Sequence, residues 1–125
     1  MHSKILLHFT LAVFIFTIST HTTFAQVNTI KITDFSVNAK DKKVMIDWKT
    51  DGKAATNYFA IQKSSDGINY RTIAMVLGPD PKQNNCDCYG CSDKYTTTSK
   101  QYYRLVHVAA DGTEQVSAAK MLAML

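Results

Sequence analysis

The chain has few of the residues from which catalytic sites are built. It contains four histidines among 125 residues, and only His107 lies beyond the first 25 positions. A Ser-His-Asp or Cys-His arrangement could therefore be assembled only around His107. The G-x-S-x-G, H-E-x-x-H and glycine-rich phosphate-binding motifs are all absent. A lone histidine in a β-rich stretch is typical of a structural or surface residue, so the sequence predicts a protein that is not an enzyme.

The chain also lacks a block of like charge and a sustained helical period. Its formal net charge is +4, and its lysines and arginines are scattered, with no run longer than two. A nucleic-acid-binding surface needs a clustered basic stripe, so no nucleic-acid partner is expected. No segment shows apolar residues repeating every 3.6 positions, and we therefore expect an all-β protein.

The first 25 residues have the pattern of a signal peptide. Lys4 supplies a short positive region, residues 5–18 are mostly apolar, and the segment ends in Thr23-Phe24-Ala25. An uncleaved membrane anchor is the alternative, but the apolar stretch is shorter than the roughly 20 residues a spanning helix needs. We expect cleavage before Gln26, no membrane span afterwards, and a secreted or periplasmic (cell-envelope) protein. Residues 26–125 then form one domain.

The clearest strand is Val44-Met45-Ile46-Asp47-Trp48. Apolar Val44, Ile46 and Trp48 alternate with Met45 and Asp47, a period of two that is typical of a strand with one buried face. Trp48 is the only tryptophan of the chain. We expect it to anchor the packing of two sheets.

Similar patterns continue along the chain. Strands are expected near residues 30–35, 44–48, 57–63, 70–77, 101–108 and 114–119, with a short extended piece or loop at 86–92. Residues 38–42 fit a five-residue hairpin loop, 64–67 and 110–112 fit turns, and 78–85 reads as a loop. In the segment 101–108, apolar residues stand at both odd and even positions, as expected for a central strand buried on both sides or for a strand at a sheet crossing. About seven short strands in one small domain predict an immunoglobulin-like β-sandwich.

With these strands placed, the sequence resembles the fibronectin type III superfamily, in particular a subfamily of secreted and surface proteins of bacteria. The matching motifs are VMIDW at 44–48, FAIQKSSDG at 59–67, YGCSD at 89–93, and YYRL at 102–105 followed by Asp-Gly at 111–112. The resemblance as a whole extends over roughly residues 32–121. The resemblance implies a non-catalytic spacer or binding unit. Cys91 stands where that family tends to carry an aromatic residue.

Three cysteines lie within six residues, at Cys86, Cys88 and Cys91. In an exported protein such a cluster indicates oxidation, and the odd count leaves one thiol over. If the segment is extended, Cys86 and Cys88 lie on one face about 6.6 Å apart, near the upper limit for a bridge. Cys91 would then face the other side, and a bridge to it would need a turn at Gly90. A local disulfide, a reduced cluster and an intermolecular disulfide all stay open.

Metal binding is a further alternative for this cluster. Three thiolates in a C-x-C-x-x-C pattern could hold zinc or Cu(I), with His107 or Asp93 as a fourth ligand. A second ligand pair, usual in tetrahedral zinc sites, is missing. We therefore expect no cofactor.

Several other side chains are weaker candidates. Tyr58 and Tyr95 could make exposed aromatic contacts with a partner, whereas at least one of Tyr102 and Tyr103 is expected in the core. The carboxylates that could pair as acid and base are Asp34, Asp47 and Asp93. Their positions suit strand ends and solvent-facing sites instead.

Together these patterns predict an exported, non-catalytic β-sandwich module that acts through its surface. It would bind a protein or glycan partner or serve as a structural component, using edge strands and the region 78–100. The alternative is a thiol redox or metal-handling protein that uses Cys86, Cys88 and Cys91. The sequence specifies neither the partner nor the oligomeric state.

Overall fold

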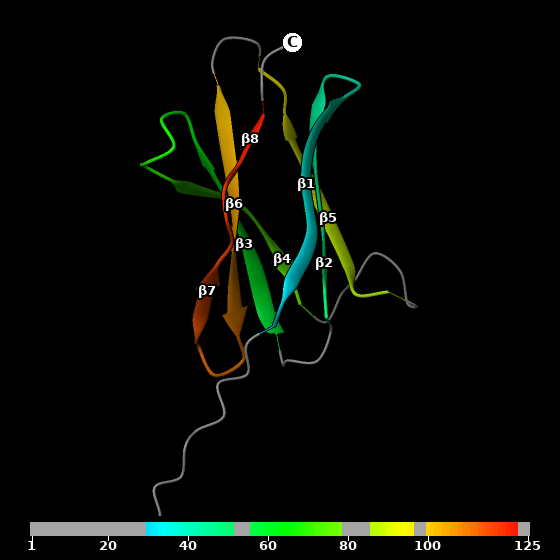
Figure 1. Cartoon of the computed structure of the whole chain (residues 1–125), viewed down its shortest axis with the longest axis vertical. Helices are drawn as coiled ribbons and strands as arrows, with labels where there is room; N and C mark the ends of the chain where they lie inside the picture. Colours follow the sequence, from blue (N-terminus) through cyan, green and yellow to red (C-terminus); the bar gives the residue numbers. More distant parts are fainter. Residues whose placement is uncertain (1–29, 52–55, 79–85, 97–99, 123–125) are drawn as a thin grey trace, which may run out of the picture.

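The chain folds into two antiparallel β-sheets that face each other (Figure 1). The computed structural model describes residues 30–51, 56–78, 86–96 and 100–122, and these contain strands but no helix. One sheet has the order β1 (Ile32–Lys40), β2 (Lys43–Thr50), β5 (Cys88–Lys94). The other runs β4 (Arg71–Leu77), β3 (Thr56–Ser64), β6 (Gln101–Ala109), β7 (Glu114–Val116), and β8 (Lys120–Leu122) also pairs with β6. The predicted all-β architecture of two packed sheets is confirmed.

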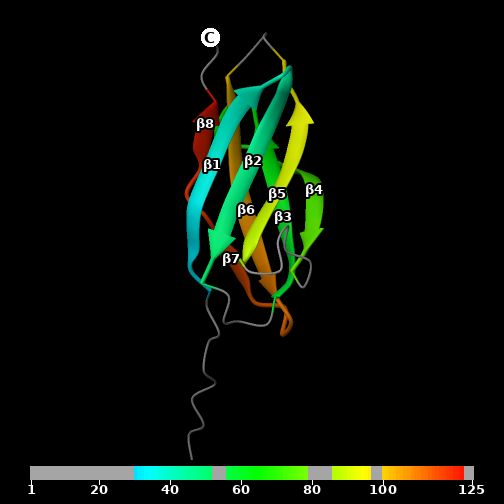
Figure 2. The ribbon, with the colours of Figure 1, turned by 90° about the vertical axis from the view of Figure 1, so that its right-hand side faces the viewer.

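The core lies between the sheets, as the alternating pattern of β2 predicts. Val44, Ile46 and Trp48 are fully buried, while Met45 and Asp47 between them are partly exposed. Figure 2 shows the three-stranded sheet in front of β3 and β6. The Trp48 ring lies 5.3 Å from the ring of Phe59 in the opposite sheet and 5.8 Å from that of Tyr89 on β5. Trp48 therefore anchors the packing of the two sheets.

The hairpin between β1 and β2 is tighter than the predicted five-residue loop. The strands pair up to Lys40 and Lys43, so only Asp41 and Lys42 form the turn. Both have positive φ, 50° and 60°, which is the conformation of a two-residue type I′ turn. Residues 38–40 belong to the strand because they pair with β2, and their side chains are exposed there.

The C-terminal part also differs from the prediction of one strand over residues 114–119. Two short strands, β7 and β8, pair with the same edge of β6. Its other edge pairs with β3. This double pairing places β6 inside the sheet and explains its apolar residues of both parities, because Leu105 faces the core and Val106 faces outward.

Some predicted features lie outside the described residues. They are the signal peptide (1–25) and nearly all of the loop 78–85. Within the part of the chain that the structure describes, there is no helix long and apolar enough to cross a membrane.

Candidate functional site

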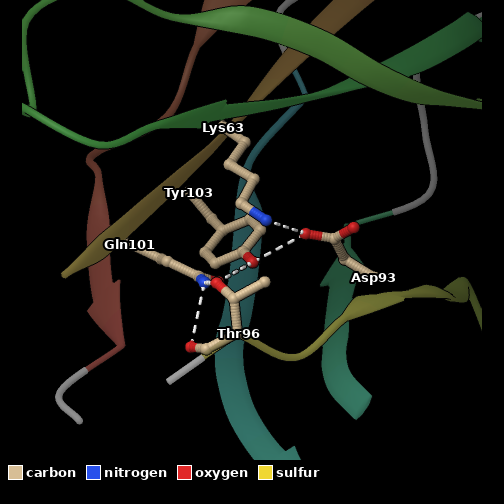
Figure 3. A network of polar contacts seen from close by, with 5 residues as sticks. All are labelled: Lys63, Asp93, Thr96, Gln101 and Tyr103. Atoms are coloured by element: carbon tan, nitrogen blue, oxygen red, sulfur yellow. Dashed lines mark hydrogen bonds and ion pairs between the residues drawn. The ribbon is translucent and has the colours of Figure 1, made fainter. Parts of the chain in front are cut away.

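A cluster of polar side chains joins the two sheets at one end of the sandwich (Figure 3). Lys63 near the end of β3 places its Nζ 2.5 Å from Oδ2 of Asp93 on β5. The hydroxyl of Tyr103 on β6 donates to the same carboxylate oxygen over 2.8 Å. Tyr103 is fully buried, and the side chains of Lys63 and Asp93 are only 15% and 18% exposed.

Gln101 and Thr96 extend this cluster. The Tyr103 hydroxyl also lies 2.7 Å from Oε1 of Gln101. A phenol has one hydrogen, so it donates either to Asp93 or to Gln101 at any moment. The Gln101 amide nitrogen donates to the side-chain hydroxyl of Thr96 and, over 3.3 Å, to the backbone carbonyl of Thr96. We call Lys63, Asp93, Thr96, Gln101 and Tyr103 the polar cluster.

The surroundings of the polar cluster keep Asp93 ionised and Tyr103 neutral near neutral pH. Burial alone would raise the pKa of Asp93, but hydrogen bonds from Lys63 and Tyr103 and the charge of Lys63 outweigh it and lower the pKa. Burial and the Asp93 carboxylate raise the pKa of Tyr103 far above its usual value. Neither group changes charge near neutral pH, so the pair is poorly suited to general acid–base chemistry.

Asp93 corrects one expectation, because it is not solvent-facing. It lies opposite Val44 in the β2–β5 register and shares the inner face with that buried residue. Asp47 has the opposite parity on β2, so it points to the outer face of the sheet. Asp34 is exposed and forms an ion pair of 3.2 Å with Lys49. Asp93 therefore lies apart from the other two carboxylates, whereas Asp34 and Asp47 line one groove together with Lys49, which pairs with Asp34.

A groove lies beside the polar cluster, against the turn between β3 and β4. It is lined by Lys63, Ser64, Ser65, Asn69, Tyr70, Arg71, Thr96 and Gln101. The turn is fixed by Asp66, whose carboxylate accepts hydrogen bonds from the backbone N–H groups of Ile68 and Asn69, both over 2.8 Å. The groove thus presents hydroxyl, amide and cationic groups on a rigid turn, an arrangement suited to a polar ligand.

The cysteine cluster contains one disulfide, between Cys86 and Cys88, whose Cα atoms are 5.2 Å apart. This is one of the pairings that the sequence left open. Cys91 is not part of this disulfide, and its side chain is partly buried and packs against the core. In β5 it has the opposite parity from Cys88, as expected for an extended segment.

The structure does not bring His107 together with the cysteines. His107 lies on β6, with its ring 5.4 Å from that of Phe59 and its Nε2 2.9 Å from the Thr56 hydroxyl. Burial lowers the pKa of this imidazole. Within residues 30–51, 56–78, 86–96 and 100–122, no three histidine, cysteine or acidic side chains are grouped to hold a metal ion.

The two tyrosines predicted to make exposed contacts, Tyr58 and Tyr95, are both partly buried. Tyr95 packs against the main core. Tyr58 packs on the outer side of the five-stranded sheet, against a second cluster of buried residues. Tyr103 is buried, which confirms the expectation that at least one of the pair at 102–103 belongs to the core.

That second cluster belongs to a surface that sequence reasoning did not identify. Ala60, Val106 and Val108 face away from the core and are 6–7% exposed. Register places Met75 beside Ala60, Leu77 beside Tyr58 and Val116 beside Val106. The last three, Met75, Leu77 and Val116, are 67%, 63% and 52% exposed. We call this set the outer apolar face: Tyr58, Ala60, Met75, Leu77, Val106, Val108 and Val116.

One signal of the outer apolar face was present in the sequence. Apolar residues of both parities in 101–108 indicated burial on both sides of that strand. The neighbours that complete the face, Met75, Leu77 and Val116, could not be assigned because the register of the β3, β4 and β7 strands was unknown.

Comparison with known proteins supports the fold but shows no family. No protein-family model and no curated protein matches the chain. Pectate lyase Pel3 from Pectobacterium carotovorum matches 70% of this chain at 18% identity and a TM-score of 0.56. A β-1,2-glucanase from Parabacteroides distasonis matches 81% of it at 19% identity and a TM-score of 0.55. The chain spans only 26% and 13% of those two proteins, and the likeness concerns the fold alone.

Proposed function

We propose that the chain is an exported, non-catalytic β-sandwich module that binds a protein partner through the outer apolar face. Its fold would be immunoglobulin-like and similar to fibronectin type III domains. This part of the proposal is based on the sequence motifs at 44–48, 59–67 and 102–105. Export rests on the leader pattern of residues 1–25. The short spans matched in the lyase and the glucanase agree with a domain that serves as one part of larger proteins.

The outer apolar face is the observation that carries this proposal. Antiparallel sheets of sandwiches usually bury one face and expose a polar one. Here the second face of the five-stranded sheet carries aliphatic side chains over β4, β3, β6 and β7, and three of them are more than half exposed. Contiguous apolar surface of this kind marks a contact site.

The chemistry of the outer apolar face favours a protein over a glycan. Sugar rings are bound by flat aromatic side chains with hydrogen-bonding groups around them, and this face offers one half-buried tyrosine among aliphatic groups. Aliphatic side chains without charge are typical of the centre of a protein–protein interface. The polar cluster supports a non-catalytic role, because its charged groups serve to hold the sheets together.

The proposal is tested by capture of partners from the compartment to which the chain is exported. Val116→Lys places a charge in the outer apolar face, and Ile68→Lys is the matched control, because Ile68 is 81% exposed on the β3–β4 turn. After cross-linking, we expect wild type and Ile68→Lys to recover the same protein and Val116→Lys to recover about tenfold less. Equal recovery by all three would overturn the proposal. A second copy of the chain counts as a partner here.

A further inference from the structure

The strand register arranges the outer apolar face in rows that cross the five-stranded sheet. The middle row contains Met75 on β4, Ala60 on β3, Val106 on β6 and Val116 on β7, each directly opposite the next. Every residue of this row is apolar. It forms a continuous band from one edge of the sheet to the other.

The two rows beside the apolar band carry charges of opposite sign. On one side, Leu77, Tyr58 and Val108 lead to Glu114. On the other side, Thr72 and Gln62 lead to Arg104. Glu114 is exposed and forms no ion pair with a described residue.

Arg104 is held in place toward the outer side of the sheet. Its Nε donates to Oε1 of Gln62 over 2.7 Å, and its guanidinium lies 4.0 Å from the centre of the Tyr70 ring. Neither contact neutralises its charge. The row of Glu114 crosses β6 at Val108, four residue steps from Arg104, a distance of about 13 Å. The apolar band therefore has the positive group of Arg104 in the row on one side and the negative group of Glu114 in the row on the other side.

We infer that the partner of the outer apolar face is a second copy of this chain. A two-fold axis along the apolar band would lay the band of one copy on the band of the other. It would also exchange the flanking rows, so that each Arg104 lies over the partner's row that ends in Glu114. Self-complementarity of this kind is what an isologous dimer requires. The inference rests on the proposed function and names its partner.

The charges of Arg104 and Glu114 favour a second copy of the chain over an unrelated protein as the partner. A foreign partner has to supply its own groups to match Arg104 and Glu114. A second copy supplies both, in the correct positions, because the two residues lie on opposite sides of the axis and on neighbouring strands. Aligned sheets pack about 10 Å apart, a gap that the arginine of one copy and the glutamate of the other close together when Arg104 turns from Tyr70 toward the partner.

The test is a charge exchange measured by sedimentation equilibrium on the full chain. Wild type should be a dimer. Glu114→Arg and Arg104→Glu should each raise the dimer dissociation constant about tenfold or more, because each change creates two like-charge contacts. An equimolar mixture of the two variants should restore the dimer, since both contacts of the mixed dimer then join opposite charges. Asp51→Arg, an exposed charge reversal at the end of β2, is the matched control and should leave the dimer unchanged.

A second measurement covers the case in which Arg104→Glu fails to fold. Arg104→Lys keeps the positive charge and supplies an amine that carbodiimide can couple to Glu114. In a mixture of isotopically light and heavy chains, coupled peptides should contain residue 104 of one copy and residue 114 of the other. Coupling only within a single chain would overturn the inference.

The other outcomes are also decisive. A wild-type monomer at hundreds of micromolar would overturn the second copy as partner. So would a mixture of variants that is no more dimeric than either variant alone. If Val116→Lys still loses capture of a different protein in that case, the proposed function stands and only the identity of the partner is wrong. If it loses nothing, both fail.

Discussion

Tyr103 and Asp93 are joined by a 2.8 Å hydrogen bond that runs from β6 in one sheet to β5 in the other. The same carboxylate oxygen lies 2.5 Å from Lys63 on β3. Burying a carboxylate is unfavourable unless its oxygens are hydrogen-bonded and its charge is paired. These contacts allow Asp93 to lie on the inner face of its sheet, where it stabilises the packing of the two sheets at one end of the sandwich.

Removal of the Tyr103 hydroxyl should weaken the contact between the two sheets. We expect Tyr103→Phe to lower the free energy of unfolding by about 1–2 kcal/mol, because Asp93 loses one donor in a site with little water. Tyr102→Phe is the control, since the Tyr102 hydroxyl has no hydrogen-bond partner among residues 30–51, 56–78, 86–96 and 100–122. Urea unfolding measures both. Equal stability of the two variants would show that the hydrogen bond contributes nothing.

Asp93 should make the free energy of unfolding depend on pH in the acidic range. Its pKa is lowered in the folded state, so its contribution is fully present above the unfolded pKa of about 4 and is lost as pH falls below that value. Asp93→Asn should cost about 3 kcal/mol near neutral pH, because it leaves Lys63 without its charge partner. Urea midpoints of the two proteins should converge as pH falls from about 5 to about 2.5. A constant difference over this range would contradict the assignment.

His107 should make stability depend on pH in a higher range. Burial lowers the pKa of His107 in the folded state, so folding is favoured most when the imidazole is neutral in both states. Stability is therefore highest above the unfolded pKa of about 6.5 and falls as pH decreases below it. We expect wild type to lose stability between pH about 7.5 and about 5.5, and His107→Gln to lose less. Identical pH profiles would show that the imidazole titrates as it does in the unfolded chain.

The cysteine pairing predicts a definite pattern of alkylation. Denatured without reductant, the chain should take up one alkyl group, and after reduction it should take up three, as intact mass shows. Reduction should lower stability by no more than about 1.5 kcal/mol, because the bridge closes a very short loop. Three alkyl groups without reductant, or a mass that includes bound zinc, would favour the redox or metal-handling alternative.

Local patterns predicted much of the sandwich. Alternation in 44–48 located the core face of β2, and the order of turns located most of the other strands. The tight hairpin at Asp41-Lys42 has no such signal in the sequence, because neither residue is glycine, yet both adopt positive φ. The C-terminal pattern predicts one strand where the structure has two, because a short interruption between two short strands leaves little trace in composition.

The candidate sites depend on contacts between distant segments, and the sequence indicates those poorly. Lys63 and Asp93 are 30 residues apart and meet only because the two sheets pack at one end. The outer apolar face needs the register of four strands, and a shift of one residue would turn its members into the core. For the cysteines, spacing allowed several pairings, and the structure joins Cys86 to Cys88, the first residue of β5.

Oxidation of two methionines tests most directly whether the outer apolar face is covered. Met75 lies in this face and is 67% exposed in the isolated fold, whereas Met45 is partly buried on the outer side of the three-stranded sheet. In the dilute purified chain, hydroxyl radicals should oxidise Met75 faster than Met45. In the protein in its native compartment, before purification, we expect the order to reverse, with Met75 protected. If Met75 is still oxidised faster there, the face is open to solvent and is not the surface through which this protein works.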